Sequence, residues 1–344
     1  MMKIKNSNGF IEQFEDLKMI EYITQRNDFK KELNKTKYLI VEGKDDADII
    51  NSYLEHKGFY TRKSYPFQII TPSQYKLETN DMNIQVIKID GKQSVLDIIT
   101  HTIENEKKEQ FCCLIDRDLD FILERKSNLE NVFYYDYYEL ENYLLSKDVI
   151  SKILLAIKYK YKEIAELEDI SIILDRLEEL DDIFKDYAFL NVLREFNYHE
   201  KIPLGKRLND DELEKIVKLS RQMHASTLHH YCISLNLNDS IQKLLNTTLE
   251  ECSICMDDLK ERYPEIENIM TNNSILKHLV DGKRVMDMFL LAIKHVFLNS
   301  QKNDIQDFYS RLKNDWIPCH SKEFNEKIKQ IENYFNIQKD PVAI

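Results

Sequence analysis

The feature that most constrains the fold is a pair of apolar runs, each of which ends in acidic residues. Residues 38–41 lead into Glu42, and residues 111–115 lead into Asp116. Continuous apolar sequence of this length is typical of a parallel strand that is buried on both faces. Open α/β sheets place their functional sites at the carboxyl ends of such strands. The two runs therefore predict a parallel sheet with carboxylates gathered at one edge.

The segments around these runs alternate between strand-like and helix-like patterns. Short apolar runs predict strands, and apolar positions at helical spacing predict helices. This alternation favours an α/β fold with a mostly parallel sheet flanked by helices. The expected strands are Lys37–Glu42, Phe67–Thr71, Ile84–Asp90, Phe111–Asp116 and Asn131–Asp136, with helices at 9–34, Asp45–Lys57 and Gln93–Lys108.

From Lys147 onward the pattern changes, because no convincing strand is found and apolar positions recur at helical spacing. We therefore predict three parts, which are an N-terminal helix over 1–34, an α/β domain over 35–146 and a mainly α-helical C-terminal domain over 147–344. The helices expected in the last part lie near 167–187, 209–224, 238–262, 283–300, 303–315 and 321–335.

The composition limits the classes of function. The formal net charge of −12 excludes nucleic-acid binding by bulk electrostatics, so such binding would need a local basic patch, metal ions or a partner. A cytoplasmic protein with reduced cysteines is expected, because residues 1–20 carry no signal-peptide pattern. No apolar run approaches the roughly 20 residues that a membrane span needs, so no membrane partner is expected.

Three aspartates follow the second apolar run at alternating positions, namely Asp116, Asp118 and Asp120. In an extended segment Asp116 and Asp118 would share one side, where two carboxylates repel each other unless a cation lies between them. An EF-hand is excluded, because Phe121 and Ser127 occupy the places of its glycine and its twelfth-position glutamate.

Carboxylate oxygens are the ligands that Mg²⁺ and Mn²⁺ prefer. We therefore expect Glu42, Asp116 and Asp118 to act as catalytic residues and metal ligands, with Asp120 as a further ligand. The plain alternatives stay open: Glu42 could be an acid that favours a helix dipole, and the aspartates could form a solvated turn.

Two lysines each stand beside a glycine after a predicted strand. They are Lys44 and Lys92, and backbone amides with a lysine at a strand-to-helix turn suit phosphate binding. We expect them to contact substrate phosphates, although a solvated amine is an equally good interpretation of each. The Walker A pattern of ATP-binding loops is not present in the sequence.

Together these motifs resemble the Toprim domain of topoisomerases, primases and OLD-type nucleases, in which one strand ends in Glu-Gly and a later strand ends in Asp-x-Asp. Over roughly 35–150 the chain is most similar to the Toprim effector subunits of PARIS anti-phage systems (AriB-like proteins). The pieces that carry this resemblance are Val41-Glu-Gly-Lys-Asp-Asp46, Asp90-Gly-Lys-Gln-Ser94, Asp116-Arg-Asp-Leu-Asp120 and Tyr138-Glu-Leu-Glu-Asn-Tyr-Leu-Leu145, with a weaker echo at Asp281-Gly-Lys-Arg284.

The resemblance implies a Toprim-like fold and a metal-dependent endonuclease that uses Mg²⁺ or Mn²⁺ to cleave tRNA, other RNA or DNA. It implies that Asp46, the acid of the Glu-Gly-x-x-Asp motif, and Glu141, the acid of the Glu-Asn-Tyr segment, join the metal ligands. The alternatives stay open for both residues. Asp46 could be an ordinary acid in the first turn of a helix, and Glu141 could be a surface acid.

The resemblance also implies partners. Effectors of this kind are held by a separately encoded ATPase subunit, are released by a phage trigger and act as homodimers. The alternative function is a catalytically inactive Toprim-like module that binds another protein, for which the net charge of −12 speaks.

Overall fold

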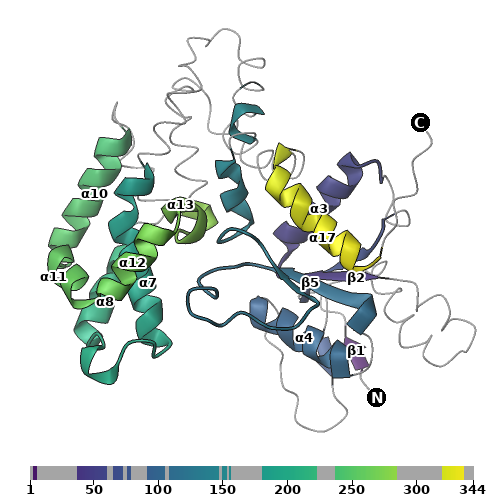
Figure 1. Ribbon diagram of the computed structural model, residues 1–344, viewed down its shortest axis with the longest axis horizontal. Helices are drawn as coiled ribbons and strands as arrows, with labels where there is room; N and C mark the ends of the chain where they lie inside the picture. Colours follow the sequence, from purple (N-terminus) through teal and green to yellow (C-terminus); the bar gives the residue numbers. More distant parts are fainter. Residues whose placement is uncertain are drawn as a thin grey trace, which may run out of the picture. The chain divides into compact units, whose positions relative to one another are not determined.

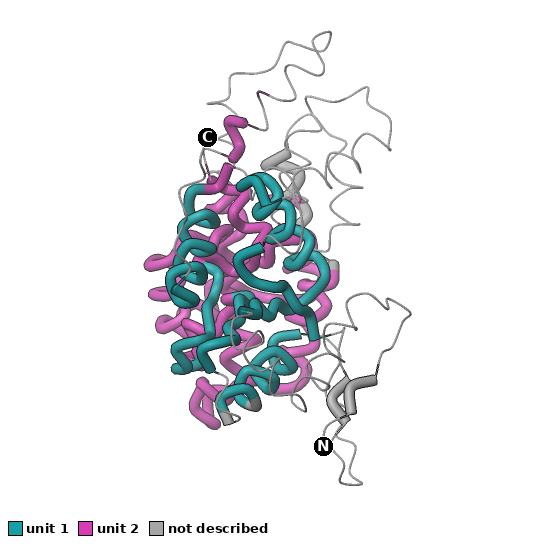
Figure 2. Tube along the Cα trace, turned by 90° about the vertical axis from the view of Figure 1, so that its right-hand side faces the viewer, with its two compact units in different colours: residues 1–116, 127–135, 322–344 teal, residues 117–126, 136–321 magenta. Residues whose placement is uncertain are grey.

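The computed structural model describes residues 3–5, 37–59, 65–72, 76–78, 91–104, 108–146, 149–152, 155, 180–222, 237–284 and 320–336. All or most of the elements predicted at 9–34, 84–90, 167–187, 283–300 and 303–315 lie outside these residues. The chain divides into unit 1, residues 1–116, 127–135 and 322–344, and unit 2, residues 117–126 and 136–321 (Figure 2). The domain boundaries predicted after residues 34 and 146 stay predictions.

Unit 1 is built on a four-stranded parallel sheet with the strand order β3-β2-β5-β6. Its strands are β2 (Tyr38–Val41), β3 (Gln68–Ile70), β5 (Phe111–Ile115) and β6 (Val132–Tyr134). Each strand lies within a predicted range, so the α/β class and the parallel sheet are confirmed. In the pairing of β2 with β5, Val41 lies opposite Leu114, and both strands end at the same edge of the sheet.

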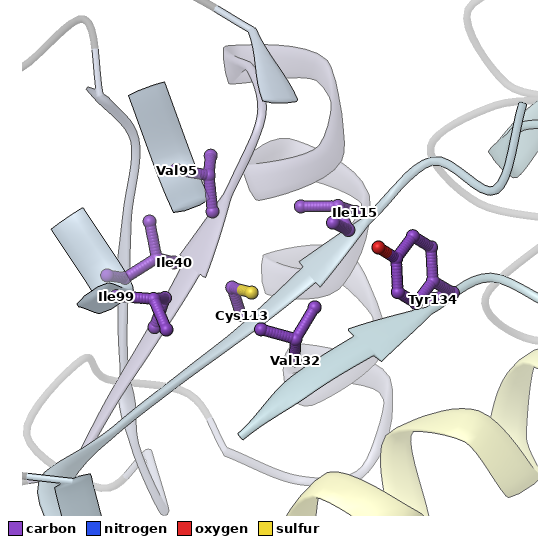
Figure 3. Packing of buried hydrophobic residues seen from close by; sticks show 7 residues of the cluster. All are labelled: Ile40, Val95, Ile99, Cys113, Ile115, Val132 and Tyr134. Atoms are coloured by element: carbon purple, nitrogen blue, oxygen red, sulfur yellow. The ribbon is translucent and has the colours of Figure 1, made fainter. Parts of the chain in front are cut away.

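One face of this sheet is covered by α4 (Lys92–Glu104) (Figure 1). Side chains alternate along a strand, so every second residue of β2, β5 and β6 points toward α4. These residues form a buried cluster with two side chains of the helix, and its members are Ile40, Cys113, Ile115, Val132, Tyr134, Val95 and Ile99 (Figure 3). The helix predicted over 93–108 is confirmed up to Glu104, since its apolar stripe packs on the sheet.

The other face is covered by α3 (Lys44–His56) and α17 (Lys322–Tyr334) (Figure 1). The ring of Phe324 lies 5.9 Å from that of Tyr53 in α3, and Tyr334 lies 5.7 Å from Phe133 in β6. The sequence predicted α17 as a helix, but not that it packs with the α/β unit. The end predicted for α3 is also confirmed, because Gly58 follows it with a left-handed φ of 94°.

Unit 1 also contains an antiparallel pair of strands that the sequence did not indicate. The strands are β1 (Lys3–Lys5) and β4 (Lys76–Glu78), and Ile4 pairs with Leu77. Three residues with a single apolar position are too few for a periodic pattern.

The described residues of unit 2 form helices joined by turns, with no strand among them. Its elements are η4 (Leu140–Leu145), α7 (Lys185–Tyr198), η6 (Leu204–Lys206), α8 (Asp210–Gln222), α10 (Leu237–Glu251), α11 (Met256–Arg262), α12 (Pro264–Asn272) and α13 (Ile275–His278). Helix α7 packs against α8 and α12, and α8 packs against α10. None of the helices described in either unit is long and apolar enough to span a membrane.

The single helix predicted over 238–262 is wrong, because the structure has two helices there. Ser253 adopts a left-handed φ of 53°, and its amide donates to the carbonyl of Glu250. The amide of Ile254 donates to the carbonyl of Leu249. These two bonds form a Schellman motif, which ends α10. The sequence concealed this end because serine, and not glycine, holds the left-handed position.

Candidate functional site

The predicted metal ligands fall into two sets, because the two units part between Asp116 and Arg117. Unit 1 holds Glu42, Asp46 and Asp116, and unit 2 holds Asp118, Asp120 and Glu141. The first set is called the strand-end carboxylates below. In unit 2 a different glutamate, Glu139, proves to be the centre of the acidic side chains.

Among the strand-end carboxylates, Glu42 and Asp116 are brought together by the pairing of β2 with β5. The backbone amide of Asp116 donates a hydrogen bond of 2.8 Å to Oε1 of Glu42. The N-cap of α3 is Gly43, without a side-chain hydrogen bond. The Glu42 carboxylate is thus directed at the end of the neighbouring strand, which is where the sequence predicted that the acids would meet.

Asp46 lies in the first turn of α3, beside the same edge of the sheet. The hydroxyl of Tyr135 donates to Oδ1 of Asp46 over 3.1 Å. Tyr135 directly follows β6 and is buried, and its amide donates to the carbonyl of Ile115 at 3.0 Å. Tyr135, at the end of the edge strand β6, therefore holds the carboxylate of Asp46 in α3. Local sequence does not predict this contact.

The two predicted phosphate-binding lysines are the first residues of α3 and α4, which cover opposite faces of the sheet. Lys44 is the exposed first residue of α3, and Lys92 is the partly exposed first residue of α4. Gly91 precedes Lys92 with a φ of 104°, a left-handed conformation that favours glycine. Both amines thus stand at helix N-termini, where backbone amides and the helix dipole favour anions. A phosphate contact by either lysine stays a prediction.

In unit 2, the backbone of Asp118 is fixed by a segment far along the chain. Asp118 has a φ of 43°, and its amide donates to the carbonyl of Tyr138 at 2.9 Å. The amide of Tyr138 in turn donates to the carbonyl of Lys277 at 2.9 Å. Asp118 therefore depends on α13 for its position, through Tyr138.

Glu139 lies near two other carboxylates, those of Glu141 and Asp118, and near Lys283. Burial, and then the charges of Glu141 and Asp118, raise the pKa of Glu139 to about 7. Glu141 is 6 % exposed, so the alternative of a surface acid is wrong for it. Glu139 is not among the predicted metal ligands, although it stands three residues before Asn142, with which it forms a reciprocal capping box.

The segment Asp281-Gly-Lys-Arg284 packs directly against the turn that carries Glu139 and Glu141, which is called the acidic turn. The amide of Gly282 donates to Oε2 of Glu139 at 3.2 Å. The amide nitrogen of the Asn142 side chain donates to the carbonyls of Leu276 and Val280 at 2.6 and 2.9 Å. A Cβ atom added at Gly282 would lie 2.6 Å from Cβ of Glu141, so only glycine fits there.

Asp120 is buried in the turn that follows Asp118. Its amide donates to the carbonyl of Arg117 at 3.1 Å, and its own carbonyl accepts from the amide of Arg125 at 2.8 Å. Its backbone thus has a structural role, and a metal contact by its carboxylate stays a prediction.

The strand-end carboxylates fit a divalent cation by donor chemistry. Within the part of the chain that the structure describes, no group of three or more His, Cys, Asp or Glu side chains could hold a metal ion by itself. Mg²⁺, however, is usually bound by one or two carboxylates, with waters and substrate phosphates completing its shell. In that mode Glu42 and Asp116 would be the carboxylate ligands, and the contact that joins these two residues is made by the backbone amide of Asp116.

Comparison of the chain with protein-family models and with curated proteins gave no match.

Proposed function

We propose that this chain is a metal-dependent nuclease of the Toprim type in which Glu42 and Asp116 are the principal metal ligands. The observation that carries the proposal is the 2.8 Å hydrogen bond between the Asp116 amide and the Glu42 carboxylate. It joins the ends of two adjacent parallel strands, where open α/β sheets place their sites. Asp46 adds a third carboxylate from the same unit. Asp118, Asp120 and Glu141 are proposed as ligands on the sequence motif alone.

The chemistry is divided between the cation and the chain. Bound Mg²⁺ or Mn²⁺ supplies Lewis-acid chemistry, which neutralises phosphate charge and activates water. The carboxylate of Glu42, oriented by the Asp116 amide, accepts the proton of the attacking water. Lys44 and Lys92, at the N-termini of two helices, hold substrate phosphates. Preorganised charge of this kind is usually the largest contribution to catalysis.

The substrate and partners rest on the resemblance to PARIS-type effectors. The proposed substrate is RNA, with tRNA first, or DNA, and the proposed setting is anti-phage defence in the cytoplasm. An ATPase would be a separate subunit, which agrees with the lack of a Walker A pattern in this sequence. The active form would be a homodimer.

A catalytically inactive module that binds a basic protein is the second candidate, which the net charge of −12 favours. Thermal unfolding in increasing Mg²⁺ or Mn²⁺ separates the two, because a ligand that binds only the folded state raises Tm. We expect the nuclease to be stabilised by the cation, and Asp116→Asn to remove that shift. An unchanged Tm in the wild-type chain, or a shift that persists in Asp116→Asn, would favour the binding module.

A further inference from the structure

Arg117, the residue between the two aspartates of the motif, is engaged with an aromatic ring. Its guanidinium carbon lies 4.3 Å from the centre of the Phe121 ring. Its Nη1 donates to the backbone carbonyl of Asp136 at 2.7 Å. A guanidinium that is hydrogen-bonded at one end and stacked on a ring is already ordered before a ligand binds. Binding then costs less side-chain conformational entropy.

Phe121 carries a second cation and is open to solvent. The ammonium of Lys126, an exposed side chain, lies 4.9 Å from the centre of the ring. Phe121 is 37 % exposed and is the one exposed phenylalanine in the described part of the chain. Arg117, Phe121 and Lys126 are called the Phe121 platform below.

The turn that carries the platform is well built. Leu119 and Leu123 point inward and are buried, and the amide of Leu123 donates to the carbonyl of Leu119 at 2.8 Å. Two side chains also tie the turn to the end of α7: Arg125 lies 2.5 Å from Nε2 of His199, and Glu124 pairs with Lys201 at 3.2 Å. Phe121 is therefore exposed on a turn whose two leucines are buried.

We propose that the Phe121 platform binds single-stranded nucleic acid, with a base stacked on the ring or on the guanidinium and phosphates paired with Arg117 and Lys126. Bases stack on both kinds of plane, and only unpaired bases expose their faces. The platform supplies the local cations that a chain of net charge −12 needs for such a partner. The inference rests on the proposed nuclease and names its substrate as an unpaired strand, such as a loop of RNA.

The test measures binding without cleavage. The full chain with Asp116→Asn, in EDTA, is titrated against labelled unstructured RNA, DNA of the same sequence and duplex RNA, with fluorescence anisotropy as the readout. We expect the single strands to bind more tightly than the duplex. Adding Phe121→Ala should weaken single-strand binding by about tenfold, since one stacked base contributes about 1–3 kcal/mol. Lys126→Ala should reduce the slope of log affinity against log salt concentration by the amount expected for about one phosphate contact.

Matched variants separate stacking from general apolar contact. Phe121→Tyr keeps a ring and should bind normally, whereas Phe121→Leu should bind as weakly as Phe121→Ala. Leu129→Ala is the surface control, because Leu129 is also 37 % exposed, and its affinity should not change. Wild-type affinity in Phe121→Ala, or no single-strand binding by the parent, would overturn the platform.

The platform and the nuclease can fail separately. If Phe121→Ala weakens binding but the wild-type chain cleaves nothing with metal, the platform stands and the nuclease is wrong. If metal-dependent cleavage occurs and Phe121→Ala binds normally, the nuclease stands and the platform is wrong.

Discussion

The two units hold their acidic side chains in different ways. In unit 1, Glu42 and Asp46 each accept a hydrogen bond from a donor at a strand end, namely the Asp116 amide and the Tyr135 hydroxyl. In unit 2, the partly buried Glu139 accepts from the Gly282 amide but also lies near the carboxylates of Glu141 and Asp118, and its pKa is raised to about 7. Donors favour a charged carboxylate, whereas burial beside like charges disfavours it. In unit 2 the burial and the like charges outweigh the donor, so that unit contains a carboxyl group that titrates near neutral pH. In unit 1 we propose that the two hydrogen-bonded carboxylates face a cation.

The largest effect is expected from removal of one charge among the strand-end carboxylates. Asp116→Asn should lower cleavage by about a hundredfold or more, because charge stabilisation at the phosphate is lost. Its Tm without metal should stay close to that of the wild-type chain. Asp48→Asn, at an exposed position of α3, is the control and should cleave normally. Full activity in a folded Asp116→Asn would end the assignment of this site.

The acidic turn of unit 2 should be destabilised by a substitution that disturbs its packing. Gly282→Ala places a methyl group 2.6 Å from Cβ of Glu141 and should destabilise the chain by about 1–3 kcal/mol in urea unfolding. Gly205→Ala is the matched control in the same unit, because nothing lies within 4 Å of a Cβ there. Equal stability of the two variants would show that residues 281–284 do not pack against the turn as described.

Two adjacent tyrosines test how the strand-end carboxylates are held. Tyr135→Phe removes the donor to Asp46 and should raise the Mg²⁺ concentration for half-maximal cleavage by roughly tenfold, as loss of an orienting partner does at metal sites. Tyr134→Phe removes the hydroxyl that accepts a hydrogen bond from the amide of Ser127. The stability of this variant should fall, while its Mg²⁺ requirement for cleavage should stay the same. Identical metal titrations for both variants would contradict a role for Asp46.

The smallest effect is a dependence of stability on pH that comes from Glu139. Its pKa in the folded chain is raised to about 7, so folding favours the protonated form. This contribution is complete below the ordinary carboxyl pKa and is lost as the pH rises through about 7. Tm should therefore decline between pH 5 and 8, by roughly 2–4 °C for each kcal/mol lost.

Glu139→Gln is the matched control for that decline, because an amide oxygen can still accept from the Gly282 amide and carries no charge. Its Tm should change less with pH than that of the wild-type chain. A decline of the same size in Glu139→Gln would mean that another group titrates.

The same contrast explains what the sequence could predict. The strands that end at Glu42 and Asp116 are local patterns, and parallel pairing brings their ends together, so this part of the site follows from residue order. Glu139 gains its surroundings from Gly282, which lies far along the chain, and no local periodicity marks that contact. The packing of Phe324 on Tyr53 could not be predicted either, because the two residues are far apart in the sequence. The stack of Arg117 on Phe121 depends on a turn whose fold a motif does not show.

The most direct test of the account is a cleavage assay with tRNA, unstructured RNA and plasmid DNA, in the presence of Mg²⁺ or Mn²⁺ or of EDTA. The wild-type chain is compared with Glu42→Gln and with the control Asp48→Asn. We expect the wild-type chain and the control to cleave at least one substrate only with metal, and Glu42→Gln to cleave none. Equal cleavage by a folded Glu42→Gln, or no metal-dependent cleavage of any substrate, would contradict it.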